Sequence, residues 1–205
     1  MEGVIKVREY TVTRCNGQPD WSTIPALQID NWFRIEPMPV AAQGQVAYDD
    51  NALYVRLSAV EENIRAELTG KLDEISEDSC LEFFFCPMPG DKRYFNIECN
   101  LNGCLYLGFG PNVDELVRLI PEVPSIVPIA QRIEDGWETV YSIPYSFIRM
   151  FFPSFFPVSG CSMRANFYKC AGKKVPPHYI TWNPVPQLPK ASFHNPDAFG
   201  VLHFA

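Results

Sequence analysis

The sequence predicts an all-β protein, an antiparallel β-sandwich or jelly roll with long proline-rich loops and one or two short helices. Alternation of apolar and polar side chains with a period of two dominates the chain, whereas helical periodicity is scarce. Aromatic residues make up 14% of the 205 residues, and 19 residues are proline. This composition favours short strands joined by rigid turns. We therefore expect one sandwich domain over residues 1–205.

The strands are predicted wherever side chains alternate between two faces. In chain order these segments are Ile5–Val12, Gln45–Tyr48, Leu53–Val60, Cys80–Cys86, Arg93–Leu101, Cys104–Phe109, Ile126–Ile133, Trp137–Ile143, Met163–Cys170, His178–Trp182 and Phe199–Phe204. Short helices are expected at Asp114–Ile120 and at Pro144–Phe152, where proline suits the first helical position. Long proline-rich connections separate several strands, and such loops often carry function.

One hairpin determines which side chains share a face. A two-residue turn at Asn102-Gly103 would mix polar and apolar side chains on both faces of the hairpin. A three-residue loop with Gly103 in the left-handed conformation pairs Glu98 with Tyr106 instead, and it separates the two kinds of side chain. Because a slip of one residue moves every side chain to the other face, we expect the three-residue loop.

With that register, one face of these strands is apolar and the other is polar and aromatic. The polar-aromatic set consists of Tyr54, Arg56, Glu82, Tyr94, Asn96, Glu98, Tyr106, Arg164, Asn166 and Tyr168. A plain solvated face is one interpretation, but such a face favours lysine, threonine, serine and glutamate. Arginine, amide and tyrosine side chains together indicate a hydrogen-bonding platform with flat apolar surfaces, which is typical of a binding surface.

This chemistry suits a sugar ring. Arginine, asparagine and glutamate serve hydroxyl groups that both donate and accept hydrogen bonds, and tyrosine or tryptophan packs against the C–H patch of the ring. Trp182 ends a predicted strand and enters a proline-rich loop, so we expect it at the rim of a binding slot. A buried position for Trp182 is the alternative.

Charge and composition exclude several classes of partner. The formal net charge is −7, with no block of lysine and arginine, which argues against nucleic acid and anionic membrane surfaces. No apolar run approaches the roughly 20 residues of a membrane span. The start lacks a secretory pattern, so we expect a cytoplasmic protein as written, or an extracellular one if a signal was removed. The 7 cysteines show no CxxC pair and no zinc-type spacing, so we expect reduced thiols.

Several tracts together resemble the family 9 carbohydrate-binding modules. In order, they are Tyr48–Val55, Glu77–Phe85, Gly136–Glu138 through Ile143-Pro144, Ile180–Asn183 and Phe199–Leu202. The resemblance implies a non-catalytic β-sandwich that binds sugars between aromatic side chains, often with structural calcium. It also implies a polysaccharide-degrading partner enzyme, commonly one that acts on xylan.

The resemblance also implies roles for individual residues. By motif position, Glu82 is a polar sugar contact, Trp182 supplies a stacking face and Asn183 supplies a hydrogen bond. A second stacking tryptophan is missing from the pattern. Tyr94, Tyr106 and Tyr168 are the candidates to replace it.

Two other functions remain open. Glu82 and Glu98 could form the carboxylate pair of a glycoside hydrolase, although paired glutamates on adjacent strands more often clamp a ligand or an arginine. Haem binding, known among related sandwich domains, would need axial ligands. The candidates for those ligands are Met163, His178, His194 and His203.

Calcium has two candidate positions. The oxygen-rich turns at Asp49-Asp50-Asn51 and from Asp73 to Asp78 could provide ligands, but neither has EF-hand spacing. Asp-Asn turns are more often plain turns.

Overall fold

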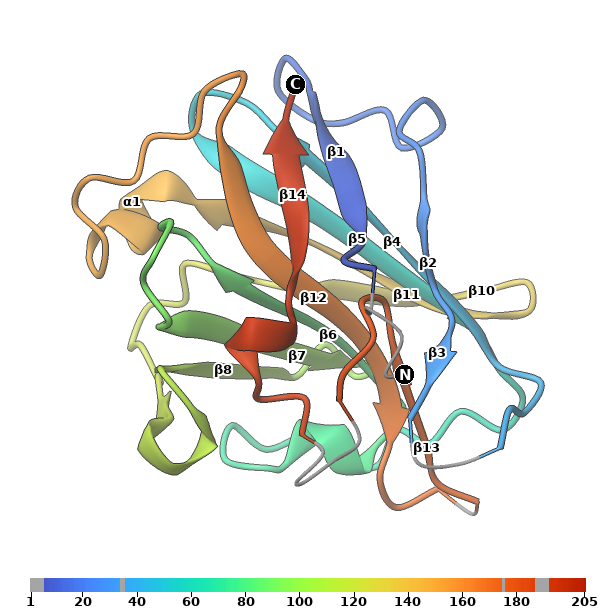
Figure 1. Ribbon diagram of the computed structural model, residues 1–205. Coiled ribbons are helices and arrows are strands. Elements are labelled where there is room, and N and C mark those ends of the chain that lie inside the picture. The colour runs from blue at the N-terminus through green and yellow to red at the C-terminus, as the bar shows by residue number, and fades with distance from the viewer. Residues whose placement is uncertain (1–5, 34–35, 175, 187–191) are drawn as a thin grey trace, which may run out of the picture.

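The strands curl into two stacked layers with very little helix (Figure 1). The computed structural model describes residues 6–33, 36–174, 176–186 and 192–205. This architecture confirms the predicted all-β sandwich. None of the described helices is long and apolar enough to cross a membrane.

We call one layer the β5 layer. Its strands lie in the order β10 (Ile129–Ile133), β11 (Gly136–Pro144), β5 (Ala52–Val60) and β4 (Ala41–Tyr48), and β2 (Leu27–Ile29) pairs with β4. All of these pairings are antiparallel. The long β5–β11 ladder, from Ala52 opposite Pro144 to Val60 opposite Gly136, makes this layer continuous.

The other layer, the β12 layer, carries the candidate site. Its strands lie in the order β14 (Gly200–Phe204), β12 (Ser162–Ala171), β6 (Cys80–Cys86), β7 (Tyr94–Asn100), β8 (Leu105–Gly110) and β9 (Val117–Arg118). At one end β13 (His178–Thr181) pairs with β12 and with β3 (Asn31–Trp32). β1 (Glu9–Arg14) joins the layers by running parallel to β14 and then to β4, so the sandwich is not purely antiparallel.

The main core lies between the two layers. Leu53, Val55 and Leu57 of β5 face Leu81 and Phe83 of β6 in one apolar cluster, as strand alternation predicts. Phenylalanine rings fill much of this space: the centroids of Phe83 and Phe167 are 4.8 Å apart and the two rings are stacked. The polar-aromatic residues therefore point outward, away from this core.

The three-residue hairpin loop between β7 and β8 is confirmed. Glu98 pairs with Tyr106 and Asn96 pairs with Gly108, while Gly103 has φ +74°. This register places Tyr94, Asn96, Glu98 and Asn100 on the outer face of the β12 layer.

The helix predictions are correct in part. The predicted helix at Pro144–Phe152 is a short α1 (Tyr145–Arg149). The predicted helix at Asp114–Ile120 is wrong: a 3₁₀ turn η2 (Val113–Glu115) leads into β9, which pairs with β8. Pairing with an open strand edge outweighs local helical preference here. Two further 3₁₀ turns, η1 (Ile75–Glu77) and η3 (Pro196–Ala198), lie in the segments beside the outer face of the β12 layer.

Candidate functional site

A pocket of about 250 Å³ opens on the outer face of the β12 layer. We call it the acidic pocket, and it is lined by Phe33, Ser76, Glu82, Glu98, Cys170, Tyr179, Ser192, Phe193 and His194. Strands β6, β7 and β12 supply its floor, and the segment before η3 supplies much of its wall. The pocket thus combines one rigid sheet face with loop residues from a distant part of the chain.

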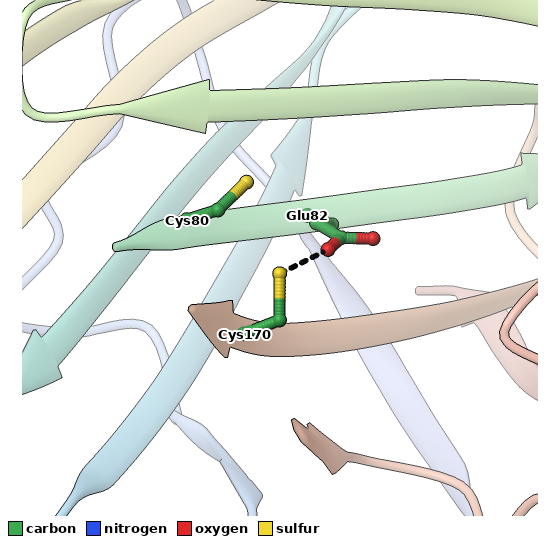
Figure 2. A group of neighbouring side chains, drawn as sticks. All are labelled: Cys80, Glu82 and Cys170. Carbon is green, nitrogen blue, oxygen red and sulfur yellow. Dashed lines mark hydrogen bonds between the residues drawn. The ribbon is translucent and has the colours of Figure 1, made fainter. Parts of the chain in front are cut away.

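Two glutamates lie side by side on the floor. Glu82 and Glu98 are directly opposed on β6 and β7, and their exposed fractions are 2% and 6%. The Cys170 thiol donates to Glu82 Oε1 at 2.9 Å (Figure 2), and Asn96 Nδ2 donates to Glu98 Oε1 at 3.1 Å. Neither glutamate belongs to an ion pair within the described residues.

This environment favours protonated carboxyls. Burial raises the pKa of Glu82 well above its ordinary value, and the neighbouring Cys170 raises it further. Burial also raises the pKa of Glu98, and the negative charge of Glu82 adds to the effect. A protonated carboxyl both donates and accepts hydrogen bonds, so this pair matches the hydroxyl groups of a ligand.

Aromatic rings form the wall above this floor. The Phe193 ring stacks on Tyr168 with a centroid distance of 4.3 Å and an interplanar angle of 19°. Phe33 and Tyr179 lie against Phe193, with centroids 5.3 Å and 6.1 Å away. Such rings offer flat apolar surfaces beside the acid pair.

His194 closes the wall next to Tyr94. Its Nδ1 and the Tyr94 hydroxyl are hydrogen-bonded at 2.8 Å, and its ring lies 5.2 Å from that of Phe84. Burial lowers the pKa of His194 to about 4, so the ring is neutral at pH 7. It therefore adds polarity without adding a charge.

Several predicted residues hold the wall in place from below. Asn166 Nδ2 donates to the Asn183 carbonyl at 3.0 Å, and the Asn183 amide donates back to Asn166 Oδ1 at 2.8 Å. The Tyr168 hydroxyl donates to the Phe193 carbonyl at 3.0 Å. Arg164 donates to the carbonyls of Asp197 and Phe199, each at 2.8 Å. These hydrogen bonds position the segment that carries Phe193 and His194.

Two other predicted residues lie beside the acidic pocket without lining it. Asn96 is fully buried, and its Oδ1 has no hydrogen-bond partner among the described residues. The guanidinium of Arg118 covers the Tyr106 ring at 4.3 Å, which leaves that face of the ring unavailable for stacking.

Tyr54 and Arg56 do not share the predicted face. Both are on β5, so they point outward from the β5 layer, on the other side of the sandwich. The Tyr54 hydroxyl donates to Asp49, and Arg56 pairs with Glu138 at 2.6 Å. The prediction of one continuous surface is wrong here, because alternation shows which side of a strand is polar but not which layer the strand joins.

The expectation of Trp182 at the rim of the binding slot does not hold for the acidic pocket, because Trp182 does not line it and borders a separate hollow with Arg8 and Pro184. The exposed fraction of Trp182 is 3%, its ring meets Phe167 edge-on at 5.5 Å, and it leaves no room for a Cβ at Gly200. Trp182 therefore belongs to the core. The neighbouring Asn183 donates to the Ala198 carbonyl at 2.8 Å, which anchors the loop.

Strand alternation did not predict the loop aromatics of the pocket. Phe193 and His194 are in a proline-rich connection and Phe33 follows β3, where alternation gives no information. A run of two aromatic residues within a proline-rich loop was the available signal, since apolar loop residues must be buried against something or exposed for binding.

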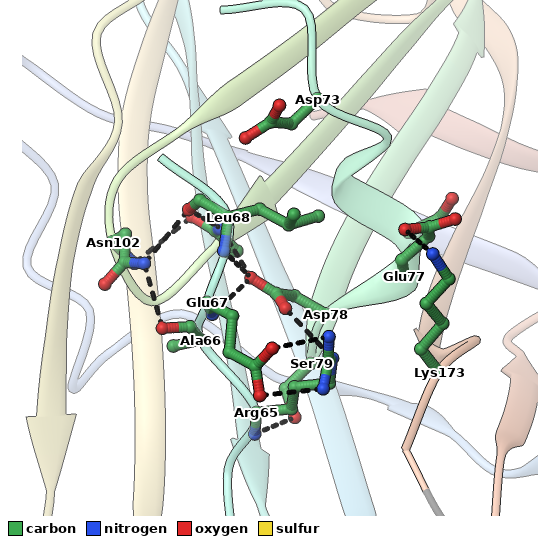
Figure 3. Close-up of polar contacts among 12 residues, drawn as sticks. Arg65, Ala66, Glu67, Leu68, Asp73, Glu77, Asp78, Ser79, Asn102 and Lys173 are labelled. Atoms are coloured by element: carbon green, nitrogen blue, oxygen red, sulfur yellow. Dashed lines mark hydrogen bonds and ion pairs between the residues drawn. The ribbon is translucent and has the colours of Figure 1, made fainter. Parts of the chain in front are cut away.

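In the turn from Asp73 to Asp78, considered for calcium, backbone amides and basic side chains of the protein already contact the carboxylates. Asp78 Oδ2 accepts hydrogen bonds from the amides of Glu67 and Leu68, and its Oδ1 faces Arg65 Nε at 3.4 Å (Figure 3). Glu77 pairs with Lys173 at 2.7 Å. Asp78 and Glu77 therefore have cationic partners, and Asp73 accepts hydrogen bonds from the amides of Thr69 and Gly70, so this turn does not fit a calcium ion.

The turn at Asp49-Asp50-Asn51 is similar. Asp49 accepts hydrogen bonds from the backbone amides of Asn51 and Ala52, and Asp50 pairs with Arg14 at 2.7 Å. It is a capped turn.

The residues considered for haem ligation do not converge. Met163 lies in the main core, whereas His203 is exposed beside Glu9. His178 is buried against Lys169, and His194 lines the acidic pocket. These residues offer no axial pair.

A second hollow of about 290 Å³ lies beneath residues 119–128. Its lining is mostly apolar, with Leu107, Leu119 and Phe147 among its residues. The acidic pocket is the better candidate because polar groups converge in it.

Comparison with known proteins identifies the family. The family model "Carbohydrate-binding family 9" matches residues 20–204. A protein from Bacteroides uniformis ATCC 8492, provisionally described as carbohydrate-binding, has a similar crystal structure with TM-score 0.82 and 26% identity. That match covers 98% of this chain and 100% of the other. A search of curated proteins found no match.

Two structures of a family 9 module from Caldicellulosiruptor kristjanssonii share the fold. The complex with glucose has TM-score 0.67 and 14% identity, and the match covers 97% of this chain and 96% of the other. The complex with cellotriose has TM-score 0.69 and 14% identity, with 96% and 93% covered. With the family model matching nearly the whole chain, the protein belongs to carbohydrate-binding family 9, and carbohydrate binding is its function.

Proposed function

We propose that the acidic pocket is where this protein binds a mono- or oligosaccharide. The observation that carries the proposal is the buried pair Glu82 and Glu98 at the floor of a pocket walled by Phe33, Tyr179 and Phe193. Hydroxyl-binding groups and flat apolar rings meet here, and a sugar ring needs both.

In this proposal the two carboxyls contact sugar hydroxyls, and the aromatic wall packs against the C–H face of the ring. Each carboxyl already accepts a hydrogen bond of about 3 Å, Glu82 from Cys170 and Glu98 from Asn96. The two side chains are therefore fixed before a sugar binds, and little side-chain entropy is lost on binding. Tyr94, Tyr168, Asn166, Asn183 and Arg164 act indirectly, by positioning the wall.

Glucose-based sugars are the first ligands to test, since the C. kristjanssonii module was crystallised with glucose and with cellotriose. We also propose that residues 1–205 act as a single module that works with a polysaccharide-degrading enzyme. Xylan is then a second source of ligand. Family membership supports this part of the proposal.

Binding without hydrolysis is the interpretation that the carboxyl pair favours. A glycoside hydrolase pairs an acid of raised pKa with a second carboxylate that stays ionised. Here burial raises the pKa of both Glu82 and Glu98. We therefore expect no release of reducing sugar from xylan or from aryl glycosides.

Isothermal titration with glucose, xylose, cellobiose, xylobiose and cellotriose tests the proposal. We expect heat with at least one sugar, and affinity reduced about tenfold or more by Glu98→Ala, since that change removes a donor and an acceptor. Tyr54→Phe is the matched control, because Tyr54 is on the opposite layer. No heat with any sugar, or equal affinities for Glu98→Ala and the parent protein, would contradict the proposal.

A further inference from the structure

Two thiols and one carboxyl converge at the floor of the acidic pocket. Cys80 and Cys170 are directly opposed on β6 and β12, and Glu82 is two residues along β6 on the same face. Their two Sγ atoms and one carboxylate oxygen all lie within 4.8 Å of one another (Figure 2). Because adjacent strands set this arrangement, it is rigid at the backbone.

The three groups are deeply buried and form few interactions with other side chains. Their exposed fractions are 0% for Cys80, 1% for Cys170 and 2% for Glu82. Both cysteines are free thiols. The hydrogen bond that Glu82 accepts within the described residues comes from the Cys170 thiol, and no basic side chain forms an ion pair with it there. A buried carboxyl without a cationic partner is a costly arrangement.

We propose that Cys80, Glu82 and Cys170 bind a thiophilic divalent cation of the zinc class. Two sulfur ligands and one carboxylate oxygen suit zinc and exclude calcium and magnesium, which prefer oxygen alone. Zinc bond lengths place ligand atoms of a tetrahedral site about 3.5–3.8 Å apart. The observed separations are close enough that side-chain rotations complete the site.

The fourth coordination position of such an ion would face the acidic pocket. Cys170 and Glu82 line the acidic pocket, whereas Cys80 is buried and is not among its lining residues. Three protein ligands with one open position are the pattern of zinc sites that accept water or a ligand atom. A water molecule or a hydroxyl group from the pocket completes the coordination, although the cation site does not require a sugar.

The charges balance without any redox step. The entering ion forms bonds to two sulfurs and one oxygen, and it displaces the thiol protons of Cys80 and Cys170 and the carboxyl proton of Glu82 into solvent. The site then holds three negative ligands around a divalent ion, with a net charge of about −1.

Cobalt titration of the reduced, oxygen-free protein tests this proposal. We expect one Co²⁺ per chain, with a sulfur-to-cobalt charge-transfer band and the intense visible bands of tetrahedral cobalt, both removed by added Zn²⁺. Cys80→Ser and Cys170→Ser should abolish the charge-transfer band. Glu82→Gln should weaken binding by about tenfold or more, since loss of even an outer partner costs that much.

Cys15→Ser and Cys161→Ser are the matched controls, because these more exposed thiols lie outside the cluster. They should bind cobalt like the parent protein. Absence of the band in the folded parent protein would overturn the proposal whatever the variants do. So would a band that persists when Cys80 and Cys170 are both replaced. Sugar titrations on the same samples measure carbohydrate binding independently, so failure of the metal site can be distinguished from failure of the proposed carbohydrate site.

Discussion

Glu61, just beyond β5, is at the centre of a buried charge cluster beneath the β12–β13 end of the sandwich. Its carboxylate is 3.0 Å from Lys169 Nζ, and neither side chain has any exposed surface. Lys174 approaches the same carboxylate at 2.9 Å, and Trp137 Nε1 donates to it at 2.9 Å. We expect Glu61→Gln to destabilise the protein strongly, because it leaves the buried Lys169 ammonium without a counter-charge.

Two independent estimates give the loss of stability expected for Glu61→Gln. Breaking a buried ion pair by removing one partner costs about 3–5 kcal/mol. Burial alone would raise the pKa of Glu61, but Lys169 and the hydrogen bonds from Trp137 and Lys174 outweigh it and hold the pKa at about 2. A fall from 4.5 to about 2 corresponds to about 3 kcal/mol. For a chain of this size, that loss lowers the Tm by roughly 6–20 °C.

Urea unfolding and thermal melting measure the effect. Lys174→Met should cost less than Glu61→Gln, because Lys174 keeps 16% of its side chain exposed. The double change Glu61→Gln with Lys169→Met should recover part of the loss, since it removes the orphaned charge. A loss below about 1 kcal/mol for Glu61→Gln, or no recovery in the double variant, would refute this reasoning.

The same cluster predicts that the free energy of unfolding decreases as the pH falls below 6.5. Burial, with the charge of Lys169, lowers the pKa of His178 from 6.5 to about 3, and the pKa of Glu61 is also lowered. Both groups bind protons more weakly in the folded state. Their contribution is therefore complete above the unfolded pKa values and is lost as pH falls, from 6.5 towards 3 for His178 and from 4.5 towards 2 for Glu61. In Glu61→Gln, the free energy of unfolding should depend less on pH below pH 4.5 than it does in the parent protein.

Three further predictions concern the acidic pocket and the turns considered for calcium. Phe193→Ala should weaken sugar binding about tenfold, as expected for loss of an aromatic wall, while Tyr54→Phe leaves the titration unchanged. Asn166→Ala should cost about 1–3 kcal/mol in urea unfolding and should also weaken sugar binding, because the carbonyl and amide of Asn183 lose their partners; unchanged affinity would show that the wall does not depend on this anchor. Adding Ca²⁺ to metal-free protein should leave its Tm unchanged, because donors and bases already occupy Asp78; a rise with calcium would show that these turns open to bind it.

Local pattern predicted much of the architecture. The strand Cys80–Cys86 has the bounds that alternation indicates, and the β7–β8 register follows from keeping Glu98 and Tyr106 on one face. These features depend on neighbours in sequence, where the period of two acts directly. Short strands such as Asn31–Trp32 carry too few residues for a period, so they were missed.

The candidate site was predicted in part for a related reason. Glu82 and Glu98 line the pocket as their strand positions suggest. Phe193 and His194 reach it from a loop whose path no local rule specifies, and Trp182 turned inward because Gly200 leaves space for its ring. Long-range packing determines both outcomes.

The sequence by itself determined the fold class, the side of each strand that faces the core, and a resemblance to a carbohydrate-binding family. Only the tertiary structure decided that Tyr54 and Arg56 belong to one layer and Glu82 and Glu98 to the other. It also brought Cys80, Glu82 and Cys170 together from strands far apart in the chain. The physical reason is that side-chain alternation is a property of one strand, whereas a pocket is formed by strands and loops whose pairing depends on the packing of the whole chain.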